Sequence, residues 1–501
     1  MVDSLAITTR SGDHMGTHLS RRHFLGGTLA AAGASLVGSG RVSAAPTGIV
    51  DVIVVGGGLS GLAAARALKA AGASVTVLEA RDRAGGRVHN ISSPKLGATL
   101  DAGAEFIGPT QGHIAGLARE YDVRTLRTYN AGDSIFVSRT GTTRVPAALP
   151  IPAVADLGQA GAALVRAQAD ALAGFPVGQP WKHPNAAYLD SITWGQYTHQ
   201  IADTQTARDL VQIAMSAPLS VRPDEVSALY YLNYIAASGD EQNPGTLIRL
   251  LSTDDGAQER LFEGGAALIP LRMARELSAN MVYNAPVRSI SYTDGIATVA
   301  GDAGTHRARR VIVAMSPAIA GQIDYRPGLP AARTGIHRGY RMGAVSKFAA
   351  LYKRPFWRDK GLSGQAYGAG RPIDVTFESY AEGNHILMGF ISADAMRRLD
   401  HAPESTLVKE CIANFVEYFG PEAADFIDYG VFKWDLEPWS RGGPVAVSRP
   451  GTLTKYGTAL REPVGPIHWA GTETSDYWTG YMDGAVRSGR RAAREILGDL
   501  R

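Results

Sequence analysis

The hydrophobic pattern of residues 51–87 predicts a strand, a helix and a second strand. The apolar run Val52–Val55 has the length of a buried parallel strand, and an Ala/Leu-rich helical stretch follows it after three glycines. A second apolar run, Val75–Leu78, ends in the acid Glu79. Two buried strands joined by a crossover helix form the repeating unit of a parallel sheet. The pattern therefore predicts an α/β fold.

The turn between this strand and its helix carries the spacing Gly56-x-Gly58-x-x-Gly61. Gly56 permits a tight turn, Gly58 lets the backbone approach a pyrophosphate, and Gly61 lets the helix pack closely on the strand. The free N–H groups of the new helix then face the phosphates. Glu79 stands eighteen residues beyond Gly61 and is placed to accept hydrogen bonds from a ribose hydroxyl. These features predict a dinucleotide site, but they do not choose between NAD and FAD.

Two further segments have the composition of loops that could contact a cofactor. Residues 100–111 form a Gly-rich stretch after a predicted strand, and a packing turn is its simplest interpretation. Near the other end, a short strand at Trp469 leads into a Gly-Thr-Glu turn, and Tyr477–Ala485 forms an aromatic-glycine-aromatic loop. A predicted helix over Ala485–Leu497 follows. Its N-terminus is suited to a polar or anionic edge of a cofactor.

Composition narrows the classes of function. The chain has 501 residues, enough for two domains or one large composite, and its 50 basic and 47 acidic residues leave a net charge of +3. The basic residues are scattered, so there is no electrostatic case for nucleic acid. The single cysteine, Cys411, excludes an internal disulfide and a cysteine-based metal cluster. Its place in the helical pattern Leu407–Phe419 predicts a buried, inert thiol, and we predict no metal site.

The N-terminal segment has the features of an export signal. Arg21 and Arg22 precede a weakly hydrophobic Gly/Ala stretch, Gly26–Gly40, and the small residues at 42–44 suit signal cleavage. This pattern is typical of the twin-arginine route, which carries proteins that fold around a cofactor before export. We therefore exclude residues 1–45 from the fold and predict export to the periplasm or the extracellular space, with the twin-arginine machinery as a partner. No later apolar stretch has membrane-spanning length, so we expect no stable membrane anchor.

The chain carries in order the motifs GGGLSG, GGR, DAGAEFIGPTQ, EVSALYYLNY, AQERLFEGG, SKFAALYKRPFW and AGTETSDYWTGYMDGA. Together they resemble the flavin-containing monoamine oxidases, and the resemblance runs from about Asp51 to Leu497. Gly85, Gly86 and Arg87 resemble the second glycine motif of FAD-dependent oxidoreductases, where these residues lie along the FAD diphosphate. The resemblance therefore favours FAD over NAD.

The implied fold has two parts. A Rossmann-type FAD-binding domain would be assembled from the discontinuous segments 50–125, 263–337 and 437–498. An inserted α+β substrate-binding domain would comprise residues 126–262 and 338–436. The overall class is therefore α/β.

The same resemblance assigns functional residues. Lys347 matches the family lysine that holds a water against the flavin N5, and Tyr481 matches one of two tyrosines that flank the substrate amine. Burial among apolar neighbours disfavours a charged ammonium, so activation of water by Lys347 is plausible. The expected cofactor contacts are Gly56, Gly58, Ser60, Gly61, Glu79, Ala80, Arg81, Gly86, Arg87, Gly103, Ala104, Glu105, Phe106, Val287, Thr472, Glu473, Gly480, Tyr481 and Met482. The expected walls of the substrate pocket are Gln258, Phe390, Ile391, Trp434 and Val445.

Some of these assignments have plain structural alternatives. Trp434 and Phe390 could equally be core aromatics, and Gln258 could be a surface turn residue.

Two positions depart from the family pattern. Pro444 stands where the vertebrate enzymes have the cysteine that binds flavin covalently, so FAD is expected to be non-covalent. Val445 replaces one of the two tyrosines that sandwich the amine, which leaves the substrate preference open.

The chemistry implied by the resemblance is oxidation of a primary amine to an imine, with the flavin N5 accepting the equivalent of a hydride. Dioxygen would reoxidise the flavin to give hydrogen peroxide, and the imine would hydrolyse to aldehyde and ammonia.

Other functions on the same fold, and other classes of function, stay open. An L-amino-acid oxidase would need an arginine for the substrate carboxylate, and a polyamine oxidase would need acids for distal amines. A third alternative is a desaturase or dehydrogenase that acts on an apolar substrate with another acceptor. A fourth is an exported flavoprotein that acts as a carrier or chaperone, and a homodimer is also left open.

Overall fold

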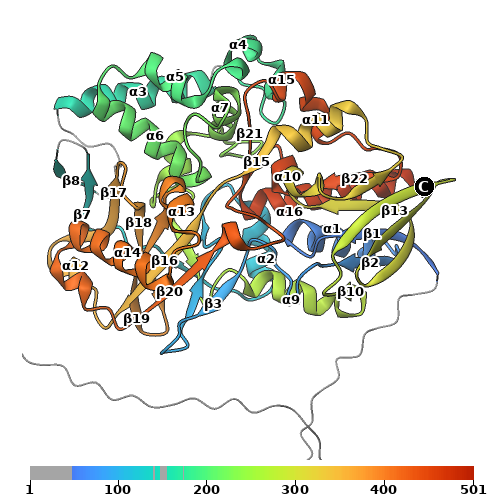
Figure 1. The fold of residues 1–501 in the computed structure, drawn as a ribbon, viewed down its shortest axis with the longest axis horizontal. Helices are drawn as coiled ribbons and strands as arrows, with labels where there is room; N and C mark the ends of the chain where they lie inside the picture. Colours follow the sequence, from blue (N-terminus) through green and yellow to red (C-terminus); the bar gives the residue numbers. More distant parts are fainter. Residues whose placement is uncertain (1–47, 139–140, 147–154, 173, 501) are drawn as a thin grey trace, which may run out of the picture. The chain divides into compact units, whose positions relative to one another are not determined.

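The computed structural model describes residues 48–500 except 139–140, 147–154 and 173. The export signal predicted at residues 1–45 lies outside the described residues. The described part belongs to one compact unit that contains two large β-sheets (Figure 1). Within it, no helix is long and apolar enough to cross a membrane, and no group of His, Cys, Asp and Glu side chains could hold a metal ion.

The first sheet begins with the unit predicted from the sequence. Strand β1 (Ile49–Val55), helix α1 (Leu59–Ala70) and strand β2 (Val75–Leu78) confirm that prediction. The strands β10, β2, β1, β13 and β22 pair in parallel, and β12 joins β13 to β11 in antiparallel pairs before β14 closes the edge. These further strands are β10 (Met281–Val282), β11 (Val287–Thr293), β12 (Ile296–Gly301), β13 (Gly304–Ala314), β14 (Asp324–Arg326) and β22 (Ile467–Ala470).

Both faces of β1 are buried, which explains its continuous apolar run. Val52 and Val54 pack in the cluster of α1 and the C-terminal helix α16 (Met482–Asp499). Ile53 and Val55 point the other way, into a cluster with strands β11–β13 and β22. Because successive side chains on a strand alternate between faces, one run of residues supplies both layers. The sheet thus places the turn after β1 between two well-packed layers.

The helix α1 approaches β1 too closely for a side chain at Gly61. A Cβ atom at this position would lie 1.9 Å from the carbonyl oxygen of Gly56. We expect Gly61→Ala to lower the free energy of unfolding by about 3 kcal/mol through overpacking. Chemical denaturation measures this loss. Gly116→Ala in helix α2 (Gly112–Glu120) is the control, because nothing lies within 4 Å of a Cβ there, and it should be neutral or slightly stabilising. Equal effects of the two substitutions would contradict this packing.

The second sheet has seven strands in the order β20-β16-β19-β18-β17-β7-β8. Helix α14 (Glu404–Phe419) covers one face, which confirms the helical pattern predicted around Cys411. The other face packs in the cluster that contains helices α3 (Ala155–Leu172), α6 (Gln205–Leu219) and α7 (Ala228–Ala236). The strands are β7 (Asp133–Val137), β8 (Thr142–Pro146), β16 (Ser346–Tyr352), β17 (Leu362–Gly368), β18 (Ile373–Ala381), β19 (Asn384–Ile391) and β20 (Asp428–Lys433).

Short strands and helices connect the two sheets. The small strands are β3 (Asn90–Ser92), β4 (Thr99–Asp101), β5 (Phe106–Ile107), β6 (Thr125–Arg127), β9 (Arg260–Phe262), β15 (Tyr340–Met342) and β21 (Ala446–Ser448). The remaining α-helices are α4 (Ala186–Ser191), α5 (Trp194–Ile201), α8 (Leu247–Leu251), α9 (Leu268–Glu276), α10 (Pro317–Ala320), α11 (Ala331–Gly339), α12 (Phe356–Asp359), α13 (Ala393–Leu399) and α15 (Leu453–Tyr456). The first sheet takes its strands from residues 49–78, 281–326 and 467–470, and the second from residues 133–146, 346–391 and 428–433. The exact domain boundaries given above stay a prediction.

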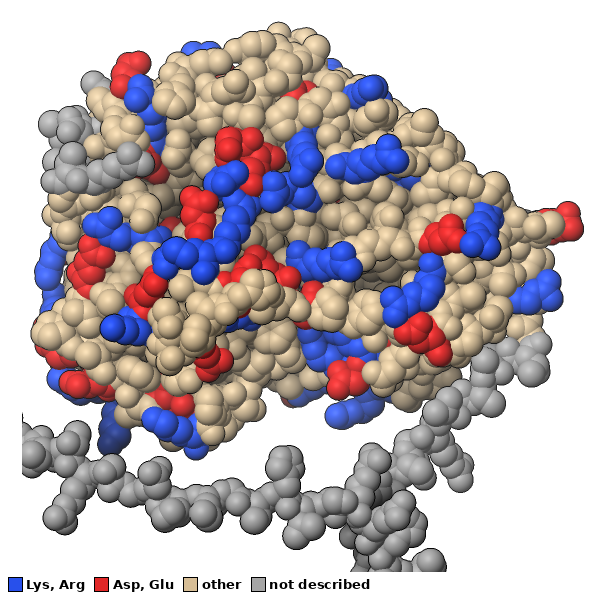
Figure 2. Space-filling model, in the orientation of Figure 1, with Lys and Arg blue, Asp and Glu red and all other residues tan. Residues whose placement is uncertain are grey.

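Basic and acidic side chains are intermingled on the face of the molecule drawn in Figure 2. No large area of this face carries one sign of charge alone. This distribution agrees with the small net charge of +3.

Candidate active site

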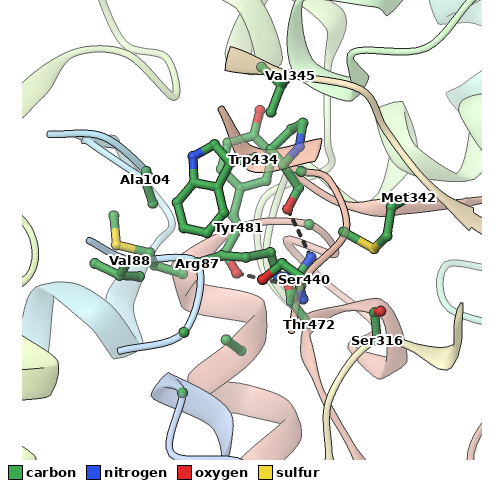
Figure 3. Close-up of a pocket in the computed structure, with 18 of the residues that line it drawn as sticks. Arg87, Val88, Ala104, Ser316, Met342, Val345, Trp434, Ser440, Thr472 and Tyr481 are labelled. Carbon is green, nitrogen blue, oxygen red and sulfur yellow. Dashed lines mark hydrogen bonds between the residues drawn. The ribbon is translucent and has the colours of Figure 1, made fainter. Parts of the chain in front are cut away.

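A cavity of about 380 Å³ runs from the turn after β1 to the second sheet. Figure 3 shows part of its wall, where Arg87, Trp434 and Tyr481 gather around the same space. The cavity brings together residues that are more than 400 positions apart in the sequence. Most of the predicted site residues line it, namely Gly56, Gly58, Ser60, Glu79, Ala80, Arg81, Gly86, Arg87, Gly103, Ala104, Glu105, Phe106, Val287, Gln258, Lys347, Phe390, Trp434, Thr472, Gly480, Tyr481 and Met482.

At one end the cavity is built for an anion. Helix α1 begins after Gly58 with no side-chain cap and no acid in its first turn, so its N–H groups are left for a ligand. A Cβ at Gly58 would meet only Gly85 and Gly86, at 3.9 Å, so these glycines keep a backbone-lined cradle open. Gly61 does not line the cavity, because its role is the close contact of α1 with the preceding turn.

Glu79 organises the two loops at this end. Its buried carboxylate accepts hydrogen bonds from the backbone N–H of Gly57 at 2.6 Å and of Arg81 at 3.0 Å. Arg81 in turn donates to the carboxylate of Glu437 at 2.6 Å and to the hydroxyl of Ser440 at 2.7 Å. The carboxylate predicted to bind a ribose is therefore present in the cavity wall and held in place.

Glu473 has a different place from the one predicted. Its fully buried carboxylate accepts from Arg87 at 2.6 Å and from the backbone N–H of Ala446 at 3.1 Å, and it does not line the cavity. It therefore acts on the cavity through Arg87, whose guanidinium also donates to the carbonyl of Pro444 at 2.8 Å. Sequence reasoning found the residue but assigned it a direct contact that the geometry gives to Arg87.

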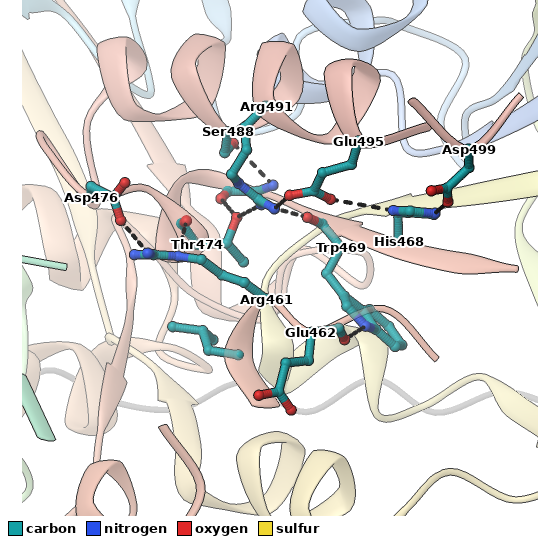
Figure 4. Close-up of polar contacts among 12 residues, drawn as sticks. Arg461, Glu462, His468, Trp469, Thr474, Asp476, Ser488, Arg491, Glu495 and Asp499 are labelled. Atoms are coloured by element: carbon teal, nitrogen blue, oxygen red, sulfur yellow. Dashed lines mark hydrogen bonds and ion pairs between the residues drawn. The ribbon is translucent and has the colours of Figure 1, made fainter. Parts of the chain in front are cut away.

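The turn after β22, which includes Thr472, is held by hydrogen bonds from Arg491 and Arg461 (Figure 4). Arg491 of α16 donates to the carbonyl of Trp469 at 2.7 Å and to the hydroxyl of Thr474 at 3.0 Å. Arg461 donates to the carbonyl of Thr474 at 2.8 Å. These bonds tie the turn after β22 to α16, so the cavity wall at Thr472 is fixed by helix and strand together.

At the other end, Lys347 on β16 reaches the cavity. Its ammonium lies 2.5 Å from the carboxylate of Glu105 and 3.1 Å from the backbone carbonyl of Asp101. The side chains of Lys347 and Glu105 are only 6% and 3% exposed. From the sequence we expected apolar neighbours around Lys347 and a direct contact between Glu105 and the cofactor. The structure corrects the first expectation, because Glu105 supplies a buried counter-charge to the lysine. Glu105 also lines the cavity, so its contact with a cofactor stays a prediction.

A second carboxyl group lies close to this pair. Burial, together with repulsion from Glu105, raises the pKa of Asp101 to about 8, although Lys347 and the N–H of Ala266 partly offset the shift. Near pH 7 Asp101 is therefore largely protonated. Glu105 is left as the charged partner of the lysine.

The substrate end of the cavity is mostly apolar and aromatic. Trp434 is fixed by a hydrogen bond from its indole N–H to the carbonyl of Ala102 at 2.8 Å. Phe390 on β19 lies 5.5 Å from the ammonium of Lys347. Gln258 donates to the carbonyl of Leu250 at 3.3 Å, and its buried amide oxygen has no hydrogen-bond partner. These three residues are cavity walls rather than core or surface residues.

Two predicted pocket residues lie outside the cavity wall. Ile391 follows Phe390 on a strand, so its side chain points to the opposite face and packs under α14. Val445 is fully buried beside Gly480, where a Cβ on the glycine would lie 3.3 Å from the valine Cγ2. The prediction of both as pocket walls is therefore corrected, and Val445 acts only as support for Gly480.

Tyr234 is a wall residue that sequence reasoning did not single out. It lines the cavity from α7, and its ring lies 6.0 Å from the ring of Tyr481. A Cβ at Gly480 would lie 2.9 Å from the Tyr234 hydroxyl, so the glycine is what lets the two tyrosines meet. The signal was present in the aromatic-rich segment 228–236, but its pattern does not say which tyrosine faces the cavity.

A family model described as flavin containing amine oxidoreductase matches residues 59–497. The chain belongs to this amine oxidase family. It is 39% identical over 457 residues to AofH of Mycobacterium tuberculosis, provisionally named a flavin-containing monoamine oxidase, with 90% of this chain and 97% of that protein covered. It is 34% identical over 459 residues to human flavin-containing amine oxidase B, with 89% and 86% covered.

Two solved structures of amine oxidases have similar folds. Cyclohexylamine oxidase from Brevibacterium oxydans superposes with a TM-score of 0.85 at 33% identity, covering 90% of this chain and all of that one. Putrescine oxidase bound to putrescine gives a TM-score of 0.84 at 32% identity, with the same coverage. These matches confirm the α/β class and the family predicted from the motifs.

Membership of the amine oxidase family implies FAD, and the cavity fits this cofactor. The uncapped start of α1 and the cradle at Gly58 suit a diphosphate. Glu79 suits a ribose, and Lys347 with Tyr481 stands at the end where a reactive ring would meet a substrate. The cavity therefore has the polar and apolar ends that an amine oxidase needs for FAD and an amine.

Proposed function

We propose that this protein oxidises apolar primary amines to imines, using non-covalent FAD and dioxygen and releasing hydrogen peroxide. The imine then hydrolyses to aldehyde and ammonia. The observation that carries the proposal is a single cavity in which a dinucleotide cradle continues into a mostly apolar pocket walled by Lys347, Tyr481 and Tyr234. Bound FAD would take up the equivalent of a hydride from the amine and pass its electrons to dioxygen.

The protein residues prepare the amine for this reaction. The aromatic rings of Tyr481 and Tyr234 form a wall on which a neutral amine can be oriented. Trp434, held through its indole N–H, and Phe390 exclude water from the same space. Lys347 presents a charged donor beside the pocket. The chain therefore contributes orientation, a dry environment and one fixed cation.

The charged residues of the cavity wall favour a monoamine as substrate. Among the described lining residues, the acids are Glu79, which binds backbone N–H groups, and Glu105, which binds Lys347. Each arginine of the wall is also paired with an acid, Arg81 with Glu437, Arg87 with Glu473 and Arg288 with Asp302. In the described part of this wall, the acids, the arginines and Lys347 all have partners, so a distal amine or a substrate carboxylate would meet no unpaired charge. This disfavours polyamines and amino acids.

The cavity wall also supports non-covalent FAD. Pro444 lines the cavity where the vertebrate enzymes have a cysteine, and proline has no nucleophile. Cys411 lies on the buried face of α14, and burial raises its thiol pKa. Acid precipitation should release all the flavin into the supernatant. Flavin that stays on the precipitated chain would contradict this proposal.

Residues 1–45 support a proposal about location. The twin-arginine pattern at Arg21 and Arg22 suggests that the protein is exported already loaded with FAD. The test expresses the full chain and an Arg21→Lys, Arg22→Lys double variant in separate cultures. Cell fractionation then measures how much of each form is exported. Export of both forms to the same extent would refute it.

A substitution at Tyr234 tests the aromatic wall. Loss of the hydroxyl in Tyr234→Phe removes the hydrogen bond to Tyr481, and such a bond is worth about 1 kcal/mol. We expect KM for a good amine to rise about fivefold, with FAD binding unchanged. Tyr230→Phe is the matched control, because Tyr230 lies on the same helix and its hydroxyl binds the carbonyl of Ala446 away from the cavity. Equal changes in KM for the two variants would refute the assignment.

A panel assay tests the proposed substrate class. The FAD-loaded protein is mixed in air with apolar primary amines, diamines, polyamines and amino acids, and peroxide is measured. The proposal expects peroxide from apolar monoamines, with kcat/KM at least tenfold above that for diamines and amino acids. A preference for putrescine would favour the diamine alternative, and peroxide from amino acids alone would favour the amino-acid oxidase alternative.

A further inference from the structure

We infer that Glu105 is a positioning residue for Lys347, which it holds as an ammonium aimed into the cavity. The inference rests on the proposed amine oxidation for its catalytic meaning. Its structural part concerns only residues of this chain.

The geometry leaves the lysine one free donor. An ammonium carries three N–H bonds and no lone pair. One bond is directed to Glu105 at 2.5 Å and a second to the carbonyl of Asp101 at 3.1 Å. The ammonium also lies 5.5 Å from the ring centre of Phe390. The third N–H is thus available to a water or a cofactor atom in the cavity.

The loop that carries Glu105 is rigid. The indole of Trp434 binds the carbonyl of Ala102 at 2.8 Å, and strand β5 pairs with β9 immediately after the loop. Gly103 packs so tightly that a Cβ would lie 2.0 Å from the carbonyl of Arg87. The carboxylate is therefore held against Lys347 from both ends of its segment. Its backbone cannot move away from the ammonium without breaking these contacts.

The charge balance of the cluster depends on Glu105. Glu105 contacts the ammonium of Lys347 directly, and the charge of the lysine also acts on the carboxyl group of Asp101. Because burial and the charge of Glu105 keep Asp101 largely protonated near pH 7, Glu105 is the counter-charge that the described residues supply to the buried ammonium. A buried cation without a partner is strongly disfavoured. Removing Glu105 should therefore favour loss of the lysine proton.

This arrangement decides what Lys347 can do. A protonated lysine donates hydrogen bonds but cannot accept a proton from the amine. A fixed cation beside the cavity also favours electron uptake by a group bound there. Lys347 therefore serves as a donor and a charge, and Glu105 acts through it without touching the substrate.

The test is a double-mutant cycle of Glu105→Gln and Lys347→Met. The first readout is the melting temperature of the cofactor-free protein. We expect Glu105→Gln to lower it by several degrees and to lower it much less when Lys347 is already methionine, because the unpaired charge is then absent. Additive effects of the two substitutions would overturn the inference.

The second readout is the pH profile of flavin reduction by an amine in the loaded enzyme. The alkaline fall in rate should move to lower pH by one unit or more in Glu105→Gln. Glu105→Asp, which keeps the charge, should restore most of the wild-type profile. Glu378→Gln, which breaks a buried ion pair with Arg358 outside the cavity, should lower the melting temperature and leave the profile unchanged.

The two proposals can fail separately. If the wild-type enzyme oxidises no amine, the proposed function fails, and the melting temperatures still decide the ion pair. If Glu105→Gln and wild type share one pH profile while amine oxidation is normal, the inference about Glu105 is overturned alone.

Discussion

Glu79→Ala should weaken FAD binding by about 10²- to 10⁴-fold. Hydrogen bonds from ligand hydroxyls to a charged group contribute about 1.5–3 kcal/mol each, and a ribose beside Glu79 would offer two hydroxyls to this lining carboxylate. The substitution also frees the N–H groups of Gly57 and Arg81, which the carboxylate now holds. The dissociation constant is measured by titrating cofactor-free protein with FAD and following flavin fluorescence.

Glu437→Gln is the control for this prediction. Glu437 binds the same Arg81 guanidinium from the other side, and it does not line the cavity. We expect its loss to weaken FAD binding by less than about tenfold, as for a supporting ion pair. Comparable losses in the two variants would mean that Glu79 acts only through Arg81, and the assignment of Glu79 to the ribose would then be wrong.

Lys347→Met should slow the loaded enzyme by about 10²-fold or more while FAD stays bound. Among the described residues that line the cavity, Lys347 is the cation at the pocket end, and the substitution removes its charge while it keeps most of the side-chain length. Loss of a single preorganised donor typically costs 10² to 10³ in rate. Stopped-flow absorbance follows flavin reduction by an amine and reoxidation by dioxygen separately.

Lys433→Met is the matched control. Lys433 lies on β20, which is next to β16, and pairs there with Ser346. Its ammonium binds backbone carbonyls at the end of α13 and does not reach the cavity. We expect both half-reactions to stay within about twofold of wild type, since no donor is lost near the reacting groups. If neither half-reaction changes in Lys347→Met, the role given to this lysine is wrong.

The dinucleotide end of the site could be read from the sequence because it is local. The run Val52–Val55, the three spaced glycines and Glu79 lie within thirty residues, and β1, α1 and β2 follow them directly. The physical constraint at Gly61 is also local, since its neighbour is the carbonyl of Gly56. Local backbone rules were sufficient for this part of the fold.

The other end of the site depends on contacts that no local pattern contains. Lys347 and Glu105 are 242 positions apart and meet only because β16 and the loop before β5 face one cavity. Their ion pair was therefore not predicted, although both residues were assigned to the site. The contact between the rings of Tyr234 and Tyr481 also joins residues that are far apart in the sequence.

Strand geometry explains the clearest error in the predicted pocket. Phe390 and Ile391 are neighbours on β19, and adjacent strand residues cannot both face the same cavity. The resemblance supplied both residues, and the alternation of the strand would have selected one. Which one faces the pocket is decided by the register of β19 against β16, which pairs Lys347 with Phe390.

The most direct test of the central claim is anaerobic mixing of the FAD-loaded protein with an apolar primary amine. The account predicts that the oxidised flavin absorbance bleaches in a single-turnover reaction and returns, with one peroxide per flavin, when dioxygen is admitted. A flavin that stays oxidised in the presence of every amine tested, although it is fully bound, would contradict the account.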